Sequence, residues 1–425
     1  MIEKIREILS ACGVSVYRIT ETKSSTAELY FIKKKLDIPR KKELTEYTVV
    51  VFRDMEKDGQ RLRAATNVIL SPGMTDEEIT ARIKDAYYAA NFAGNPWFDL
   101  PKAEQCSFAP SDSDLAALEP EEAADRLAKG IFEIDTETDA FLNSVEIFVT
   151  KKVKHIVASN GLDVSFEKCE AEGEIVAQCV TPKDVEQFRS FSFSSLDIAG
   201  LQKRALDAIR DVRARANSTE PPKGGKYDVI LTGEHLNELL YYYCARSSAQ
   251  MIYPGYSQWQ CGTAVQGDDV KGEKLDLSFV PTEPYSDEGI RMTKRELIRQ
   301  GELKLIHGPA RFCYYLGAEP TGTYRKLISE NGTVPYAKLC GEGVLEPISF
   351  SDFQMDEMDG HFKGEIRLAL LHHADGSTTL LSGGSVNGSL PEAQKNLLFS
   401  LERYEDSSYA GPLAVKIPDV SVAGL

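Results

Sequence analysis

The spacing of hydrophobic residues changes several times along the first hundred positions. Ile2, Ile5 and Ile8 recur at helical spacing and predict an amphipathic helix at the amino terminus. Alternating β-branched and aromatic residues predict strands at 27–33, 46–53 and 62–70. Asp58-Gly59 is a hairpin turn signal, and Thr75 with Glu78 forms a capping box before a helix that reaches Gly94. This pattern predicts a first α+β domain over residues 1–105.

The next stretch combines strands in hairpin succession with flanking helices. We expect a helix at 121–131 and strands at 144–150, 152–158, 163–168 and 172–180. Asn160-Gly161 predicts a hairpin turn, and Thr181-Pro182 predicts the start of a further helix. A longer helix at 195–216 closes this middle domain, residues 106–216. Such an order indicates an α+β layer and not a doubly wound parallel sheet.

Residues 217–226 are rich in Ser, Pro and Gly and read as a linker. A strand at 227–231 and a helix at 234–249 follow. Further strands are expected at 365–372, 378–381 and 413–422, with a helix at 391–401. Residues 227–425 therefore form a β-rich domain of curved antiparallel sheets. The predicted fold class is α+β, with an amino-terminal α/β half of mainly antiparallel sheets and helices ahead of that β-rich domain.

Composition narrows the possible partners. The chain has 425 residues, enough for two or three domains, and a formal net charge of −16, which disfavours nucleic acid. It has no apolar run of membrane-spanning length, and charges interrupt the apolar positions at its start, so no membrane partner or secretory signal is expected. The 8 cysteines are widely spaced and contain no CxxC pair. We expect reduced thiols in a cytoplasmic protein.

Histidine provides the first test for a hydrolytic metal site. A zincin helix carries His-Glu-x-x-His or the wider His-Glu-x-x-x-His, so that two imidazoles face the metal beside a glutamate. The chain has only 6 histidines. None is followed by glutamate, because the next residues are Ile156, Leu236, Gly308, Phe362, His373 and Ala374. The simplest hydrolytic zinc site is absent.

One weaker candidate for a metal site remains, on the helix after the linker. His235 and Glu238 are three residues apart and can point the same way, with Cys244 and Cys261 later in the domain. One His and one Glu fall short of three ligands, and an ordinary surface pair is the simpler interpretation. His372-His373 lies on a predicted strand, where neighbouring side chains face opposite sides and do not chelate one ion together.

Glycine-rich and aromatic stretches have mainly structural interpretations. Residues 341–343 and 383–388 contain no P-loop lysine and no full GxGxxG, so tight turns explain them better. No GxSxG motif occurs. Several large rings follow one another at Tyr241, Tyr242, Tyr243, Tyr253, Tyr256 and Trp259. Core packing explains part of this set, and a groove or subunit interface is the second interpretation. The residues alone indicate no self-sufficient active site.

A set of short motifs in fixed order resembles one known family. They are Glu288-Gly289-Ile290, Gly301-Glu302-Leu303, Phe362-Lys363-Gly364-Glu365-Ile366, Gly383-Gly384-Ser385-Val386-Asn387-Gly388 and Pro418-Asp419-Val420-Ser421-Val422-Ala423-Gly424. Earlier matches are Leu142-Asn143-Ser144-Val145-Glu146, Ser159-Asn160-Gly161 and residues 75–90. The chain resembles the TldD/PmbA family, once labelled modulators of DNA gyrase and now regarded as peptidase subunits. The resemblance implies an amino-terminal α/β half before a β-rich half.

The resemblance also implies where zinc would bind in a catalytic relative. TldD-type subunits carry His-Glu-x-x-x-His on the helix after the first strand of the last domain, with a later cysteine as third ligand. Here Leu236 follows His235, and Leu240 and Tyr241 leave no second histidine. The chain is therefore similar to the PmbA-type (TldE-like) subunit, which lacks the metal ligands. No catalytic or metal-binding residue is carried over, binding residues stay unknown, and zinc is expected only in a catalytic TldD-like partner.

Three functional hypotheses follow. The leading one is a non-catalytic subunit of a cytoplasmic complex that degrades or matures peptides. It would pair with a TldD-like catalytic subunit or form a homo-oligomer, and it would hold extended peptides partly by strand addition. The second is a peptidase in its own right, with a rearranged site near His235 and Glu238. The third is a peptide-binding protein without hydrolytic activity.

Overall fold

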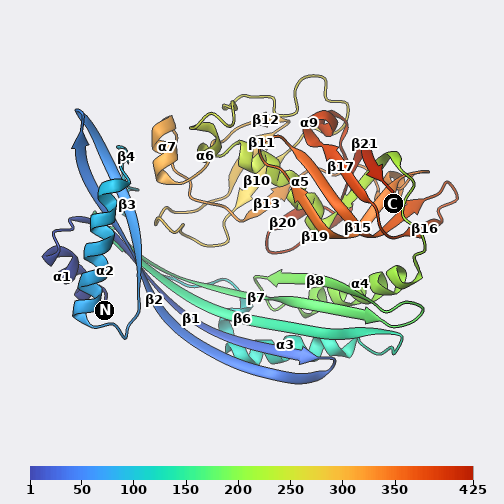
Figure 1. Cartoon of the computed structure of the whole chain (residues 1–425), viewed down its shortest axis with the longest axis horizontal. Helices are drawn as coiled ribbons and strands as arrows, with labels where there is room; N and C mark the ends of the chain where they lie inside the picture. Colours follow the sequence, from blue (N-terminus) through green and yellow to red (C-terminus); the bar gives the residue numbers. More distant parts are fainter. Residues whose placement is uncertain (425) are drawn as a thin grey trace.

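The computed structural model describes residues 1–424, which form two units joined by a short irregular segment at 218–224. The amino-terminal unit is built on one large curved sheet, and the carboxyl-terminal unit lies above it with two smaller sheets (Figure 1). Within residues 1–424, every helix is too short or too polar to cross a membrane.

The large sheet has the strand order β4-β3-β2-β1-β6-β7-β5, and β8 also pairs with β7. Its strands are β1 Val16–Ile32, β2 Lys35–Lys57, β3 Gln60–Leu70, β4 Asn95–Pro96, β5 Gln105–Ala109, β6 Ala140–Ala158, β7 Asp163–Cys179 and β8 Val185–Phe193. Strands β1 and β6 pair antiparallel from Arg18 opposite Ala158 to Ile32 opposite Ser144. The strands of the predicted domains 1–105 and 106–216 thus lie in one sheet, and their division into two domains stays a prediction.

Helices cover this sheet at both ends. They are α1 Ile2–Ala11, α2 Asp76–Ala89, η1 Ala90–Phe92, η2 Asp114–Ala117, α3 Pro120–Glu133 and α4 Ile198–Asn217. The capping box of α2 is confirmed, since Thr75 and Glu78 exchange hydrogen bonds between side chains and backbone. The Asp58-Gly59 turn is also confirmed, with φ values of 51° and 72° that suit a two-residue hairpin.

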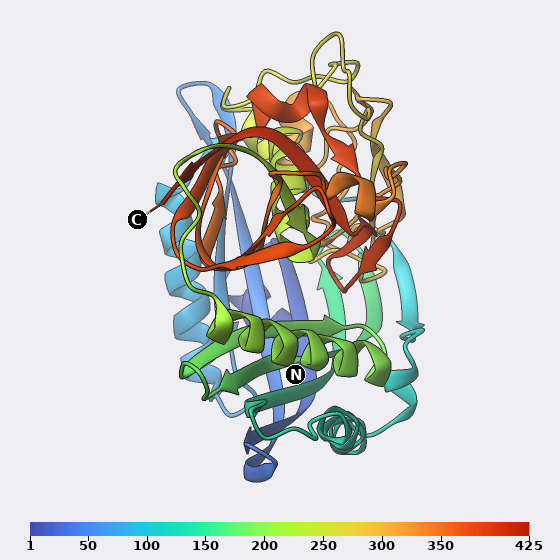
Figure 2. The ribbon, with the colours of Figure 1, turned by 90° about the vertical axis from the view of Figure 1, so that its right-hand side faces the viewer.

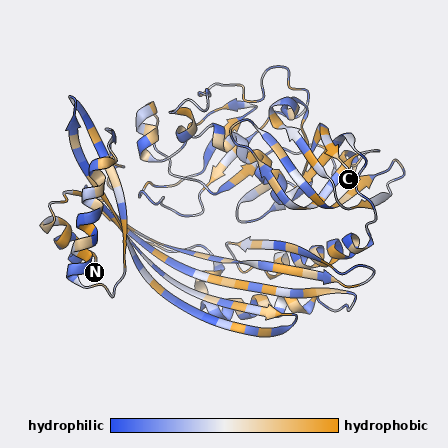
Figure 3. Ribbon diagram, viewed as in Figure 1, coloured by the Kyte–Doolittle hydropathy of each residue, from blue (hydrophilic) through white to orange (hydrophobic). Residues whose placement is uncertain are grey.

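The long strands change their buried face halfway along. Val164 and Phe166 of β7 pack toward Tyr285 of the carboxyl-terminal unit, whereas Cys169, Ala171 and alternate residues beyond them face the core around α3 and α4. Figure 3 shows hydrophobic and hydrophilic positions alternating along these strands. The break in alternation explains why 144–150 with 152–158, and 163–168 with 172–180, were predicted as separate strands. Each pair is one continuous strand.

One predicted helix is wrong, and a second is shorter than predicted. Thr181-Pro182 lies in a bend that leads into strand β8, which pairs with β7 along its whole length. The helix predicted at 391–401 is only α9 Leu390–Ala393 and η3 Gln394–Asn396, followed by strand β18 Leu398–Phe399 on β21. In both places a neighbouring strand supplies the backbone hydrogen bonds that a helix would otherwise form internally.

The carboxyl-terminal unit contains two mixed but mainly antiparallel sheets. One has the order β12-β11-β10-β13-β20-β19, and the other β14-β9-β21-β17-β15-β16, with β18 on β21. Their bounds are β9 Gly225–Thr232, β10 Leu277–Val280, β11 Arg295–Arg299, β12 Glu302–Leu303, β13 Lys326–Ser329, β14 Leu345–Met355, β15 His361–His372, β16 Thr378–Leu381, β17 Ser385–Ser389, β19 Arg403–Glu405, β20 Tyr409–Pro412 and β21 Ala414–Ala423. The remaining helices are α5 Gly233–Arg246, α6 Ala249–Ile252, α7 Ala310–Leu316 and α8 Tyr336–Leu339.

Helix α5 lies at the centre of this unit. Leu236, Leu239 and Tyr243 share one hydrophobic core with residues of both sheets. Figure 2 shows the strands near the carboxyl terminus, in red and orange, curving around this region. The predicted α+β class with a β-rich carboxyl-terminal part is confirmed.

Candidate functional site

The first place to look for catalytic residues is α5, which begins at Gly233 and carries His235 in its first turn. The His235 ring lies 4.8 Å from the ring of Phe350 and 5.3 Å from that of Phe353, measured between centroids. Its Nε2 atom has no hydrogen-bond partner among residues 1–424, and Glu234 Oε1 is 3.9 Å away. Burial lowers the pKa of His235 to about 4. The imidazole is therefore neutral and enclosed by aromatic rings at pH 7.

The other predicted members of this combination do not complete a metal site. Burial is the main cause that raises the pKa of Glu238 to about 7; the charges of Glu234 and Asp352 act in the same direction, and a hydrogen bond from the Met355 backbone acts against them. Cys244 is buried with its thiol on the Leu240 carbonyl, and Cys261 is exposed. None of these side chains belongs to a group of three metal-binding residues within the described chain. The residues on α5 do not fit a zinc ion, which needs three protein ligands.

The aromatic residues after His235 divide into core and surface. Tyr242 and Tyr243 are buried and contact Trp259, and the Tyr243 hydroxyl donates to Gln394 Oε1 at 2.9 Å. Core packing is confirmed for these two tyrosines. Tyr241, Tyr253 and Tyr256 are exposed. A groove or subunit interface built on these three stays a prediction.

The two consecutive histidines have different partners, as predicted for a strand. His372 Nε2 lies 2.8 Å from Glu346 Oε2, whereas His373 Nε2 contacts Thr379 Oγ1 at 2.8 Å. His372, Glu346 and Cys340 also form a group whose possible metal-binding atoms all lie within 4.8 Å of one another. Sequence reasoning missed this group because its members come from three separate elements. The 383–388 motif is a turn into β17, as expected, with φ of 96° and 78° at Gly383 and Gly384.

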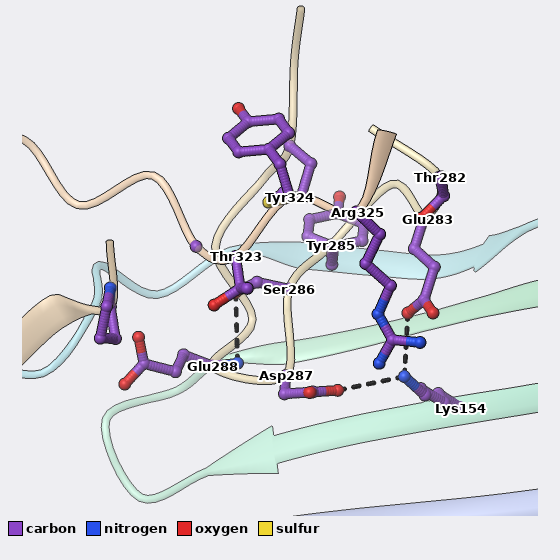
Figure 4. A pocket seen from close by; sticks show the side chains of 13 residues that line it. Lys154, Thr282, Glu283, Tyr285, Ser286, Asp287, Glu288, Thr323, Tyr324 and Arg325 are labelled. Atoms are coloured by element: carbon purple, nitrogen blue, oxygen red, sulfur yellow. Dashed lines mark hydrogen bonds and ion pairs between the residues drawn. The ribbon is translucent and has the colours of Figure 1, made fainter. Parts of the chain in front are cut away.

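A large cavity separates the two units. Its volume is about 980 Å³, and it lies between the large sheet and the loops of the carboxyl-terminal unit. The sheet side contributes residues 109–114, 167–170, 172 and 192–195, and the other side contributes residues 280–284, 325–326 and 407–408. A smaller pocket of about 180 Å³ shares Thr282, Glu283 and Arg325 with it (Figure 4). Sequence reasoning identified no residue of this cleft.

Ion pairs hold the two units together at the cleft. Lys154 Nζ from β6 lies 2.9 Å from Glu283 Oε2 and 3.1 Å from Asp287 Oδ1 of the carboxyl-terminal unit (Figure 4). On the neighbouring strand, Lys168 lies 3.6 Å from Glu283 Oε1 of the carboxyl-terminal unit and, within its own strand, 2.7 Å from Glu170 Oε2. Burial by itself would raise the pKa of Glu170, but hydrogen bonds from Lys168 and Lys152 lower it to about 2. Glu170 is therefore fully ionised at neutral pH.

Other charged groups at the cleft are available to a ligand. Asp112 and Glu172 on the sheet side and Arg325 on the opposite side are exposed. Within residues 1–424 none of the three forms an ion pair. The cleft thus presents charges of both signs from its two walls.

The cleft wall also contains a gap in the edge of the sheet. Strand β5 pairs with β7 only as far as Phe166, and β8 begins to pair with β7 at Ala171. Among the described strands, residues 167–170 of β7 have β6 alone as partner. The same residues line the cavity. An extended chain in the cleft would meet unpaired backbone groups at this edge.

Comparison with known proteins identifies the relatives of this fold. Residues 224–424 match the family model described as the PmbA/TldA metallopeptidase C-terminal domain. TldE from Thermococcus kodakarensis superposes with a TM-score of 0.76 at 18% identity, over 99% of this chain and 100% of that one. No curated protein sequence matches the chain.

Two further solved structures are named as candidate modulators of DNA gyrase. The one from Thermotoga maritima has a TM-score of 0.77 at 14% identity and covers 100% of both chains. The one from Bacteroides thetaiotaomicron has a TM-score of 0.76 at 15% identity, over 100% of this chain and 99% of that one. Residues 224–424 thus match the carboxyl-terminal domain of the PmbA/TldA metallopeptidase family, and the chain has the fold of TldE along its whole length.

Proposed function

We propose that this protein is a non-catalytic, TldE-like subunit of a peptidase-related complex, and that it holds an extended peptide in the cleft between its two units. The complex would include a TldD-like catalytic subunit or further copies of this chain. It would work in the cytoplasm, where free thiols such as the 8 cysteines persist.

The observation that carries this proposal is the unpaired edge at residues 167–170 on the wall of a cavity of about 980 Å³. Strand addition gives affinity through backbone hydrogen bonds, with little dependence on the peptide's sequence. A protein that presents peptides of varied sequence needs this kind of recognition. The absence of three zinc ligands around His235 within residues 1–424 supports the non-catalytic part.

Charge at the cleft supports a preference among peptides. Asp112 and Glu172 lie beside the unpaired edge, and Arg325 lies across from it. Cationic groups would therefore be attracted to the sheet side and carboxylates to the opposite wall. We expect unstructured peptides with basic residues to bind more tightly than strongly acidic ones of equal length, and the preference to weaken as salt rises.

The binding test uses a fluorescein-labelled unstructured peptide and its analogue with N-methyl groups at alternate residues. N-methylation removes backbone donors without changing the side chains. Loss of about two hydrogen bonds should weaken binding by at least about tenfold. Equal affinity of the two peptides, measured by fluorescence anisotropy, would rule out strand addition.

A variant of the protein locates the binding site. Ser194→Trp places a large ring in the cleft, where Ser194 is exposed. Ser71→Trp is the matched control, because Ser71 is exposed on the amino-terminal unit and does not line the cleft. Ser194→Trp should weaken peptide binding by about tenfold or more while Ser71→Trp leaves it unchanged. Equal effects of both variants would place the peptide elsewhere.

The proposal that this subunit is non-catalytic is tested on the isolated chain. The chain should leave an unstructured peptide intact with or without added zinc, and His235→Ala should change nothing. Cleavage that disappears in His235→Ala or Glu238→Ala, with assembly retained, would instead support a peptidase with a rearranged site on α5. Peptide binding without any TldD-like partner in pull-downs would favour a binding protein outside a hydrolytic complex.

A further inference from the structure

A second cluster of chemically active side chains lies away from both α5 and the cleft. Cys340 follows α8, Glu346 is in β14, and His372 ends β15. Their sulfur, oxygen and nitrogen atoms lie within 4.8 Å of one another. Thiolate, imidazole and carboxylate are the three ligand types that proteins use for zinc.

The cluster faces away from the core that contains α5. Leu345 and Leu371 pair across β14 and β15 and pack on that core. Side chains alternate between the two faces of a sheet, so the following residues, Glu346 and His372, point to the opposite face. Cys340 belongs to the small apolar group there, together with Ile230. The cluster and His235 are therefore on different faces of one sheet.

The carboxylate of Glu346 is buried, and the charge of Arg210 acts on it only from beyond ion-pair distance. Its exposed fraction is 2%, and that of His372 is 8%. Within residues 1–424, no Lys or Arg forms an ion pair with Glu346, and its only such contact is His372 Nε2 at 2.8 Å. Burial of an ionised carboxylate is costly unless a partner offsets the charge. A divalent cation would supply that charge.

The neighbouring groups already orient the ligands. The Tyr336 hydroxyl donates a hydrogen bond to Glu346 Oε1, which leaves Oε2 toward His372. The backbone N–H of His372 donates to the Val344 carbonyl at 3.0 Å and fixes the end of β15. Outer hydrogen bonds of this kind hold metal ligands in place. Cys340 is only partly buried, so water can reach the cluster from its side.

We propose that Cys340, Glu346 and His372 bind one Zn²⁺ ion, with water as the fourth ligand. Zinc bonds of about 2.0–2.3 Å in a tetrahedron place ligand atoms roughly 3.3–3.7 Å apart. Binding requires the His372 and Glu346 contact to open by about 0.5–1 Å, with the hydrogen bond replaced by two metal bonds. The ion would fasten α8 to the sheet, and it has no part in the peptide cleft.

The site is tested with Co²⁺ as a spectroscopic substitute for Zn²⁺, on the full chain under a phosphine reductant. We expect one Co²⁺ per chain, with the near-ultraviolet band of a thiolate–cobalt bond, and displacement of Co²⁺ by Zn²⁺. Cys340→Ser should abolish the thiolate band, and His372→Ala should weaken Zn²⁺ binding by about 100-fold. Cys261→Ser and His373→Ala are the matched controls and should behave as the unchanged chain does.

Thermal unfolding checks that the variants fold and gives an independent result. Zn²⁺ should raise the Tm of the unchanged chain and of Cys261→Ser but not that of Cys340→Ser, because an ion that binds the native state stabilises it. No binding at one ion per chain, or binding that survives Cys340→Ser, would overturn the inference. Binding lost in His235→Ala instead would place the metal on α5 and would also contradict the proposed non-catalytic role.

Discussion

His235 and His372 lie in the same unit, and both are largely withdrawn from solvent, but their neighbours differ completely. His235 is enclosed by the rings of Phe350 and Phe353, and its Nε2 has no partner in the described chain. His372 meets the carboxylate of Glu346, with the thiol of Cys340 nearby. The family resemblance directs attention to the first histidine, whereas the chemistry of a metal site is present around the second.

The comparison shows that burial alone does not make a histidine functional. An aromatic enclosure lowers the pKa of His235 and keeps the ring neutral, but it supplies no second ligand. A buried carboxylate beside His372 supplies both a ligand and a negative charge. The two faces of this sheet therefore differ: one packs a neutral histidine among aromatic rings, and the other places a histidine beside a carboxylate.

The largest effect is expected from removal of the Glu346 carboxylate. Glu346→Ala leaves His372 and Tyr336 without their buried partner and should lower the free energy of unfolding by about 3 kcal/mol. Urea denaturation of the metal-free chain measures this change. Glu365→Ala, at an exposed position of β15, is the control and should cost less than about 1 kcal/mol. Similar effects of both variants would mean that the cluster contributes little to stability.

The next largest effect is expected from His235→Phe at acidic pH. A native pKa of about 4 against 6.5 in the unfolded chain means that the unfolded state takes up the proton first as the pH falls. The stability that the native state gains while His235 is neutral in both states is fully present above pH 6.5 and is lost as the pH falls toward 4. His235→Phe keeps the aromatic packing and cannot be protonated, so at pH 5 it should retain about 2 kcal/mol that the unchanged chain loses.

Urea denaturation at pH 7 and pH 5 gives this result for His235→Phe. His361→Phe, at an exposed position of β15, is the control; it removes only the solvent-exposed ion pair with Asp359 and should change the acid dependence far less than His235→Phe does. If His235→Phe loses as much stability between pH 7 and pH 5 as the unchanged chain, then His235 is protonated in the native state and its enclosure is open to water.

The smallest effect concerns Glu238. Its native pKa of about 7 lies above the ordinary value of 4.5, so its contribution is fully present below pH 4.5 and is lost as the pH rises through 7. Because Glu238 is only partly buried, solvent screening reduces the effect. Glu238→Gln should stabilise the chain by about 1 kcal/mol at pH 8 and by almost nothing at pH 4.

A pair of urea titrations at pH 4 and pH 8 checks the Glu238 prediction. Glu56→Gln, on the exposed part of β2, removes the same charge and should leave stability unchanged at both values. A Glu238→Gln variant that is less stable than the unchanged chain at pH 8 would show that the ionised carboxylate is favourable in the native state, and α5 would then present a usable charged group after all.

Local signals in the sequence were reliable where the interactions are themselves local. The capping box at Thr75, the hairpin turn at Asp58-Gly59 and the helix close to 121–131 agree with the structure, since each depends on residues a few positions apart.

Predictions failed where a distant strand decided the local conformation. The Thr181-Pro182 pair is a good helix start, yet the segment after it pairs with β7. The interrupted alternation near residues 150 and 168 resembled strand ends, but it reflects strands that cross from one core to another. Neither outcome is visible in a window of ten residues, because the partner strand or core lies elsewhere in the chain.

The sequence by itself determined the fold class, the family resemblance and the lack of a His-Glu-x-x-x-His motif, because each depends on residue identity and short spacing. Tertiary structure alone decided which side chains meet. It brought Cys340, Glu346 and His372 together from separate elements, and it placed residues 167–170 of β7 on the wall of the cleft between the units. Such contacts depend on sheet pairing across long stretches of chain, and the residues involved carry no common local pattern.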